Sequence, residues 1–194
     1  MARVYVSIGS NIDRERNIRS SMDRLRAEYG SLLASMVYES DPVGFEGERF
    51  LNLVVGFDTS HSPEDVFETL RAIERQCNRT RCKARYSSRT LDLDLLLYDD
   101  RVIQTPKMNI PRDEILFHAF VLRPLAEIAG EDRHPINGRA FGQLWAEFDK
   151  SRQKIWPVPF DRPVGNSGID EQRNRANERG NHGERATPWH KGGS

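Results

Sequence analysis

The sequence predicts an α+β fold, a ferredoxin-like βαββαβ sandwich with additional C-terminal helices. The prediction depends on the order of the hydrophobic periods. Segments with strand alternation and segments with helical spacing follow one another as strand, helix, strand, strand, helix and strand. Two further helical segments come after the last of these strands. The 194 residues suffice for one domain of this kind with a sizeable core.

The first three strands and the first helix are marked by apolar runs and by the turn residues between them. We expect a strand at residues 4–8, a helix at 14–29, and strands at 32–39 and 50–58. Gly30 can end the helix, and the proline and two glycines of residues 40–49 indicate a loop.

The second helix has a well-marked start. Ser62 is the expected N-cap, Pro63 occupies the first helical position, and Asp65 completes a capping box. An Arg-rich segment then leads to the fourth strand. Beyond that strand we expect a short strand near residues 101–103 and helices at about 117–128 and 141–148.

The chain divides into a folded part and a polar end. We expect residues 1–158 to form the domain. Residues 159–194 are rich in Arg, Asn, Glu and Gly, and they contain too few apolar side chains to bury the surface that ordering requires. We therefore predict that they form a disordered tail.

The composition argues against several classes of protein. The formal net charge is zero, so no bulk field attracts the chain to nucleic acid or to a membrane surface. No apolar run approaches the roughly 18 residues of a membrane span, and the first residues lack the apolar stretch of a secretory signal. Cys77 and Cys82 fit neither a zinc motif nor a disulfide framework. We expect a cytoplasmic protein that binds neither nucleic acid nor a membrane, as a monomer or a weak oligomer.

Residues 89–97, which read Arg-Thr-Leu-Asp-Leu-Asp-Leu-Leu-Leu, are the most informative segment. Strand alternation places the leucines at 91, 93 and 95 on one face and Asp92 and Asp94 on the other, with the carboxylates roughly 7 Å apart along the chain. Mg²⁺ typically binds one or two carboxylates together with substrate phosphates. The alternative is that the two carboxylates form only the solvated face of an amphipathic strand. A bound polyanion is favoured by the cations that crowd before this strand, which are Arg71, Arg75, Arg79, Arg81, Lys83, Arg85 and Arg89.

Six short motifs follow one another between residues 8 and 125. They are Ile8-Gly9-Ser10-Asn11, Tyr38 through Gly44, Phe50-Leu51-Asn52, Ile73-Glu74 through Arg81, Arg89-Thr90-Leu91-Asp92-Leu93-Asp94, and Phe120-Val121-Leu122-Arg123-Pro124-Leu125. In these motifs the chain resembles the 6-hydroxymethyl-7,8-dihydropterin pyrophosphokinase family of folate biosynthesis. The resemblance implies a ferredoxin-like fold with α extensions. It also implies transfer of diphosphate from ATP to the pterin hydroxymethyl group, with release of AMP.

The resemblance further implies a set of site residues. Two Mg²⁺ ions would be bound by Asp92 and Asp94, and the catalytic residues would be Arg79, Arg81, Arg85, Arg89, Asp92 and Asp94. A loop carrying Arg81 and Arg85 would close over ATP. The nucleotide would contact Glu74, Arg79, Arg89, Ile103 and Arg112. The pterin would contact Ser40, Asp41, Val43, Phe50, Asn52 and Phe120, with the two phenylalanine rings stacked on it.

Several of these residues also have a simpler interpretation. Phe50 and Phe120 can be ordinary core residues. Asn52 lies in an apolar strand, where its side chain can be satisfied by a bond to the backbone. Glu74 can be a solvated acid on the surface of a helix.

The chain departs from the family pattern around the nucleotide, at Tyr86, Ser87, Ser88, Arg112 and Asp113. Arg112 stands where the family usually has a histidine. These differences leave open a diverged paralogue that acts on a related pterin or is non-catalytic. An RNA-recognition module has the same βαββαβ order, but it needs aromatic residues alternating on its central strands, and residues 50–58 lack them.

Overall fold

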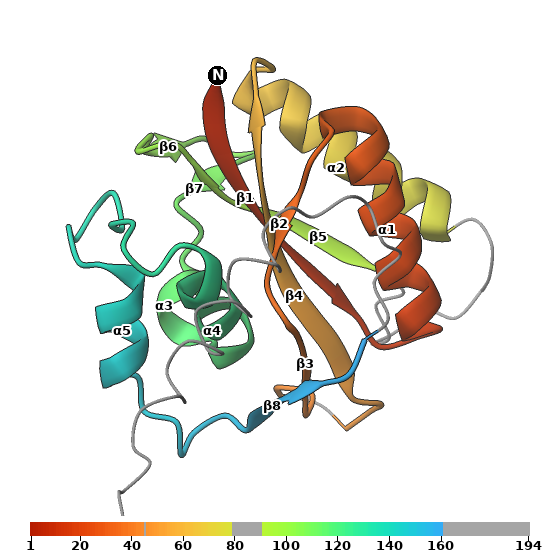
Figure 1. Cartoon of the computed structure of the whole chain (residues 1–194), viewed down its shortest axis with the longest axis vertical. Coiled ribbons are helices and arrows are strands. Elements are labelled where there is room, and N and C mark those ends of the chain that lie inside the picture. Colours follow the sequence, from red (N-terminus) through yellow and green to blue (C-terminus); the bar gives the residue numbers. More distant parts are fainter. Residues whose placement is uncertain (45, 79–90, 161–194) are drawn as a thin grey trace, which may run out of the picture. The chain divides into compact units, whose positions relative to one another are not determined.

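The computed structural model describes residues 1–44, 46–78 and 91–160 (Figure 1). The strands are β1 (Ala2–Ser10), β2 (Leu33–Ala34), β3 (Val37–Ser40), β4 (Phe50–Thr59), β5 (Asp92–Tyr98), β6 (Ile103–Gln104), β7 (Asn109–Ile110) and β8 (Ile155–Val158). The helices are α1 (Arg14–Tyr29), α2 (Pro63–Asn78), α3 (Glu114–Phe117), α4 (Ala119–Ile128) and α5 (Phe141–Glu147). The predicted series of strands and helices is present, with β3, β4 and β5 as its second, third and fourth strands.

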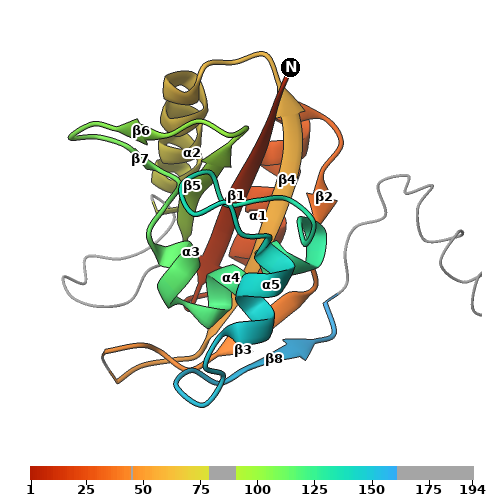
Figure 2. The ribbon, with the colours of Figure 1, turned by 90° about the vertical axis from the view of Figure 1, so that its left-hand side faces the viewer.

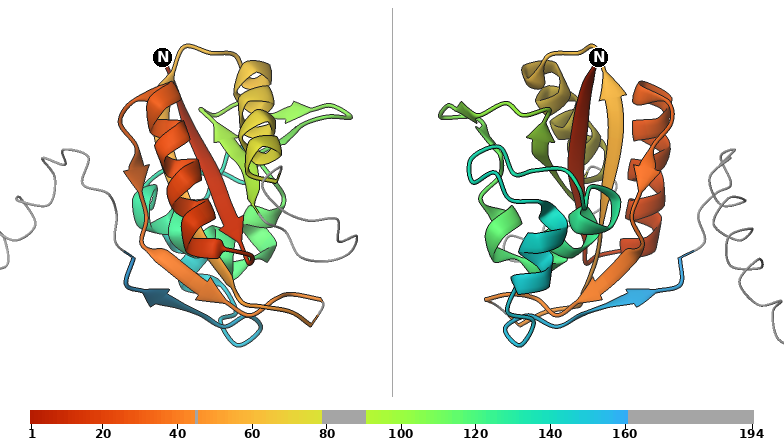
Figure 3. Two further views of the ribbon diagram at one scale, coloured as in Figure 1. Left: turned by 90° about the vertical axis from the view of Figure 1, so that its right-hand side faces the viewer. Right: turned by 60° about the vertical axis from the view of Figure 1, so that its left-hand side comes forward.

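The main sheet is antiparallel. Its strands follow the order β5-β1-β4-β3-β8, and β2 also pairs with β4. β6 and β7 form a separate two-stranded sheet. Helices α1 and α2 cover one face of the main sheet, seen from the front in the left view of Figure 3. Helices α3, α4 and α5 lie over the opposite face (Figure 2). The described residues thus form a mixed α/β fold around an antiparallel sheet.

Each face of the sheet has its own apolar cluster. Val4, Val6 and Ile8 of β1 pack with side chains from α1 and α2. Tyr5, which lies between them in sequence, packs with side chains from α3, α4 and α5. Because successive residues of a strand point to opposite faces, β1 contributes to both clusters.

β5 contains an irregularity that changes which face its residues reach. Tyr5 of β1 pairs with Leu97, and the next residue, Val6, pairs with Leu95, so Leu96 is an extra residue in β5. Leu95 accordingly packs on the α1–α2 side, whereas both Leu96 and Leu97 pack on the α3–α5 side. The bulge therefore lets β5 present two successive leucines to the α3–α5 side.

The predicted start and end of the first helix and the predicted start of the second are confirmed. The Asp65 N–H donates to Ser62 Oγ at 3.2 Å, and the Ser62 N–H donates to an Asp65 carboxylate oxygen at 3.3 Å. These are the two bonds of a capping box. α1 covers the predicted residues and ends at Gly30, whose φ of 79° favours glycine.

Several elements differ from the prediction. The strand expected at 32–39 is split into β2 and β3, because Ser35 between them turns its Oγ to the Val54 N–H at 3.0 Å. The helix expected at 117–128 begins at Ala119 as α4, and an unpredicted short helix, α3, lies just before it. The extended backbone of His118, with φ −119° and ψ 119°, separates the two. β7 and β8 lie in segments for which the sequence pattern predicts no strand.

The predicted tail, residues 159–194, lies outside the described residues except for its first two positions. Phe160 packs against the α1–α2 cluster, and Arg19 of α1 lies over its ring at 4.8 Å from the centroid. None of the described helices combines the length and the hydropathy that crossing a bilayer requires.

Candidate active site

Three strands bring predicted site residues together where β1 ends and β4 and β5 begin. Gly9 of β1 is paired with Asp92 of β5 on one side and with Asn52 of β4 on the other. Paired residues of antiparallel strands point to the same face, and neighbouring strands are about 4.8 Å apart. Asp92 and Asn52 therefore share a face at a spacing of about 10 Å between their backbones. It is the face on which Tyr5 packs against α4.

Gly9 keeps the space between Asp92 and Asn52 open. A Cβ at position 9 would lie 3.3 Å from Asn52 Oδ1, tighter than ordinary van der Waals contact. Even an alanine would crowd the Asn52 amide, and a larger side chain would fill the gap. The glycine of the Gly-Ser-Asn motif thus has a steric reason for its position.

The predicted faces of β5 are confirmed. The leucines at 91, 93 and 95 are buried in the α1–α2 cluster. Asp92 and Asp94 are partly exposed on the opposite face. The two carboxylates are thus on the same face as Gly9 and Asn52.

Asp94 belongs to a cluster of charged groups. Arg112 Nη2 lies 3.1 Å from Asp94 Oδ1 and 2.9 Å from Glu114 Oε1. The bulge in β5 helps to place this arginine, because the Arg112 N–H donates to the carbonyl of Leu96 at 3.0 Å. Burial first, and then the charge of Asp92, raise the pKa of Asp94 to about 6, and Arg112 opposes that shift. A carboxylate disfavoured in this way is stabilised by an added cation.

Glu74 supports the acidic strand from α2. Its buried carboxylate accepts a hydrogen bond from the Leu93 N–H at 2.8 Å and pairs with Arg71 at 2.7 Å. The interpretation of Glu74 as a solvated helix acid is therefore wrong. Arg71 also interacts electrostatically with Asp92 and Asp94. Its only signal in the sequence was its place among the clustered cations.

A groove of about 920 Å³ lies next to Asn52. Four of the six residues predicted to contact a pterin line it, namely Ser40, Asp41, Val43 and Phe120. Phe120 is partly buried, and its ring stacks on the ring of His118 with centroids 4.8 Å apart. Because Phe120 faces the groove, it is not an ordinary core residue.

Asn52 and Phe50 do not line the groove, but both are neighbours of Ser40, which does. Asn52 is buried, and its Nδ2 donates to Ser40 Oγ at 3.0 Å. Its partner is thus a side chain and not the backbone that the simpler interpretation expected. Phe50 is partly buried and is paired with Ser40 across β3 and β4.

The opposite wall of the groove comes from a segment that sequence reasoning missed. Gln153 and Ile155, just before and within β8, line the groove. The Gln153 side chain donates to the Phe117 carbonyl at 2.7 Å and accepts the Ala119 N–H at 2.8 Å, which ties the segment to α3 and α4. The apolar run that starts at Ile155 was the only local signal for this wall.

The remaining predicted residues are placed less directly. Ile103 of β6 is partly buried against the α1–α2 cluster.

Among the described residues, no group of three or more His, Cys, Asp or Glu side chains is arranged to hold a metal ion. A metal site built from these residues would therefore need oxygens from a ligand as well as from Asp92 and Asp94. Four predicted site residues lie outside the described residues: Arg79, Arg81, Arg85 and Arg89.

Comparison with known families decides where this arrangement belongs. The model of the 7,8-dihydro-6-hydroxymethylpterin-pyrophosphokinase (HPPK) family matches residues 5–130. The chain belongs to the HPPK family. This matched range contains every motif from which the resemblance was drawn, and it ends before α5 and β8.

Named relatives agree with the HPPK assignment. The 2-amino-4-hydroxy-6-hydroxymethyldihydropteridine pyrophosphokinase of Pseudomonas aeruginosa is 38% identical over 148 residues, which cover 74% of this chain and 90% of that protein. The enzyme of the same name from Bacillus subtilis is 34% identical over 171 residues, covering 86% of this chain and 93% of that one.

Solved HPPK structures agree in fold. The wild-type HPPK-DHPS of Plasmodium falciparum with pteroate matches with a TM-score of 0.63 at 13% identity, covering 75% of this chain. The chain spans 42% of that longer protein. At this low identity the likeness supports the fold alone.

Proposed function

We propose that the protein transfers diphosphate from ATP to the hydroxymethyl group of 6-hydroxymethyl-7,8-dihydropterin in folate biosynthesis. The hydroxymethyl oxygen attacks the β-phosphorus, the bond from that phosphorus to the α-phosphate oxygen breaks, AMP leaves, and the hydroxyl proton is released. One observation carries the proposal for this member of the family. The carboxylate pair and the pterin-type groove lie on one face of the sheet, with Gly9 between Asp92 and Asn52.

The groove is the proposed pterin site. Phe120 and Phe50 would stack on the flat heterocycle, and Asn52 would read its amide edge. Ser40 Oγ orients Asn52 by accepting its Nδ2–H, which leaves Oδ1 available to a ligand donor. Asp41 and Val43 would line the edge of the bound ring.

The carboxylate pair is the proposed metal site. Asp92 and Asp94 would hold two Mg²⁺ ions together with phosphate oxygens, and the raised pKa of Asp94, caused first by burial and then by the charge of Asp92, supports a cation at these carboxylates. When bound, the ions neutralise charge on the transferring phosphates and polarise the attacking hydroxyl. Arg112, which neutralises Asp94 in the structure, would then be free to turn to a phosphate.

The triphosphate of ATP is proposed to lie between the carboxylates and the clustered cations. Within the described part of the chain, Arg112 Nε and His118 Nδ1 are buried without a hydrogen-bond partner. Buried polar atoms are normally paired, so the Arg112 atom supports a polar ligand beside Asp94, and the His118 atom supports one beside Phe120. The further proposed nucleotide contacts that follow from the family pattern alone are Arg79, Arg89 and Ile103, and on the same ground Arg81 and Arg85 are proposed as catalytic residues. Glu74, which the family pattern also places near the nucleotide, would act through its hydrogen bond to the Leu93 N–H of β5.

Several broader properties belong to the same proposal. Residues 1–158 would be the catalytic domain, and its core would be ferredoxin-like, which the strand order β5-β1-β4-β3 and the two helices on one face support. We further propose that the protein is cytoplasmic, acts as a monomer or weak oligomer on small molecules, and does not bind nucleic acid. An RNA-recognition module is disfavoured because the acidic pair, without bound metal ions, would repel a phosphate backbone.

An assay of AMP release with Mg²⁺, ATP and the dihydropterin tests the proposal. Asp92→Ala and Asp94→Ala should each keep less than about a tenth of the wild-type kcat while the melting temperature changes little. Asp100→Ala, in the exposed turn after β5, is the matched control and should keep wild-type activity. No dihydropterin-dependent AMP from the wild type, or a kcat above a tenth in either strand variant, would contradict the proposal.

A further inference from the structure

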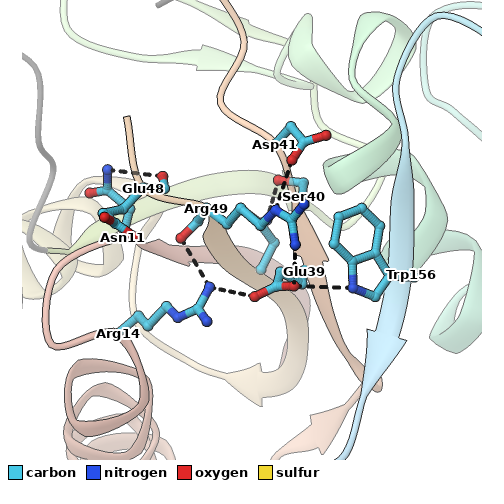
Figure 4. Close-up of polar contacts among 9 residues, drawn as sticks. Asn11, Arg14, Glu39, Ser40, Asp41, Glu48, Arg49 and Trp156 are labelled. Atoms are coloured by element: carbon cyan, nitrogen blue, oxygen red, sulfur yellow. Dashed lines mark hydrogen bonds and ion pairs between the residues drawn. The ribbon is translucent and has the colours of Figure 1, made fainter. Parts of the chain in front are cut away.

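A cluster of five side chains, which we call the clamp, links the two ends of the loop between β3 and β4 to α1 and β8 (Figure 4). Its members are Arg14, Glu39, Asp41, Arg49 and Trp156. They come from α1, β3, the loop itself and β8, and they include two carboxylates and two guanidinium groups. The loop, residues 41–49, begins with two of the proposed pterin contacts and leads directly into Phe50.

Glu39 is the centre of the clamp. Its side chain is only 13% exposed. One carboxylate oxygen lies 2.6 Å from Arg14 Nη1, and the other accepts the indole N–H of Trp156 at 3.1 Å and lies 3.5 Å from Arg49. A carboxylate this buried is stable only while its donors remain in place.

Arg49 joins the two ends of the loop. Its Nε donates to Asp41 Oδ1 at 2.9 Å, and its carbonyl accepts a hydrogen bond from Arg14 at 3.2 Å. Its guanidinium carbon lies 4.8 Å from the centre of the Trp156 ring. Because the Arg49 side chain is 54% exposed, its ion pairs alone contribute little. The aromatic ring adds a contact that water does not replace.

Successive side chains of β8 lie on opposite faces of the sheet, one on the side of the groove and the next on the side of the clamp. It pairs with β3 so that Ile155 is opposite Ser40 and Trp156 is opposite Glu39. Ile155 and Ser40 both line the groove. Trp156 and Glu39 therefore point to the reverse face, where Arg14 of α1 meets them.

We propose that Trp156 is a positioning residue for the pterin site, acting through Glu39 and Arg49 to fix Asp41 and the start of β4 at Phe50. The assignment rests on the proposed function. It extends beyond the motifs of the family, because β8 lies past the matched residues 5–130. A C-terminal strand thus sets the shape of a substrate site that is built mainly from the first half of the chain.

The alternative is that Trp156 only closes the edge of the sheet, and a set of variants separates the two roles. Trp156→Ala removes both the indole donor and the ring. Trp156→Phe removes the donor but keeps an aromatic ring under Arg49. Val158→Ala is the matched control, because Val158 packs from the same strand on the α1–α2 cluster and is paired with Val37, outside the clamp.

The readouts are the KM of each substrate, kcat and the equilibrium dissociation constant of the dihydropterin. We expect Trp156→Ala to raise the KM and Kd of the pterin by about tenfold and Trp156→Phe by about threefold, the effects of losing two contacts or one. The KM of ATP and the kcat should change less than about twofold in both variants, and Val158→Ala should change none of the four values beyond that. Amide hydrogen exchange of residues 46–50 should be faster in Trp156→Ala than in Val158→Ala.

The possible failures are distinguishable. A wild-type protein that binds no dihydropterin would overturn the proposed function and this assignment together. A wild-type protein that binds it, with Trp156→Ala within twofold of its Kd, would overturn the clamp alone. Equal losses of pterin affinity in Trp156→Ala and Val158→Ala would also overturn it, because they would trace the effect to general loosening of β8.

Discussion

The hydrogen bond between Glu74 and the acidic strand leads to a prediction whose size follows from the structure. Glu74 on α2 is 7% exposed and accepts the Leu93 N–H at 2.8 Å and a guanidinium N–H of Arg71 at 2.7 Å. Leu93 stands between Asp92 and Asp94, and β5 is the last strand on its side of the sheet. The Glu74 carboxylate therefore does for this strand what a further neighbouring strand would do.

Glu74→Ala leaves the Leu93 N–H buried without an acceptor, which costs about 1–3 kcal/mol. The lost pair with Arg71 adds at most about 1 kcal/mol, because that guanidinium is 36% exposed. We expect the free energy of unfolding to fall by about 1–4 kcal/mol in Glu74→Ala, and by less in Glu74→Gln, which keeps an acceptor oxygen. For a domain of this size, the Tm of the alanine variant should fall by roughly 2–16 °C.

Urea denaturation and calorimetry without ligands measure these changes, and titration with ATP measures nucleotide affinity. Glu68→Ala, on an exposed position of the same helix, is the control and should change the free energy of unfolding by less than about 0.5 kcal/mol. If Glu74→Ala kept the wild-type Tm and lost ATP affinity, Glu74 would be a direct nucleotide contact. The structural reasoning about β5 would then be refuted.

Three further predictions test other parts of the molecule. Gly9→Val should raise the KM of the dihydropterin by at least about tenfold in steady-state kinetics, because a branched side chain would fill the space beside Asn52 Oδ1. An unchanged KM would show that the dihydropterin does not use this space. Arg112→Ala should lower kcat/KM for ATP by about tenfold or more and Arg112→Lys by less, and equal values for both would exclude a role for its charge. Burial lowers the pKa of His134, against the opposing charge of Asp113, so the unfolded chain binds a proton near pH 6.5 that the folded protein does not. The contribution of His134 to stability should thus fall as the pH drops through about 6.5, with a slope of at most about 1.4 kcal/mol per pH unit. It should level off below the pKa of His134 in the folded protein. Urea unfolding from pH 5 to 8 measures this change, which His134→Gln should lack.

The sequence by itself determined the features that depend on neighbouring residues. The capping box of Ser62 and Asp65 was readable because both partners lie within one turn of helix. The two faces of β5 were readable because side chains alternate along any extended strand, so Asp92 and Asp94 had to share a face. The family was readable because its motifs are short and follow one another in a fixed order.

The tertiary structure alone decided which distant groups meet. Nothing local to Glu74 or Leu93 shows that they share a hydrogen bond, because the pairing depends on how α2 packs on β5. Similarly, the pattern around Trp156 gave no sign that this residue would lie opposite Glu39, 117 residues earlier in the chain. Periodicity reports how the backbone turns from one residue to the next. Sheet register, bulges and the packing of non-local segments are set by the free energy of the whole fold, so the groove and its clamp appear only when the chain is folded.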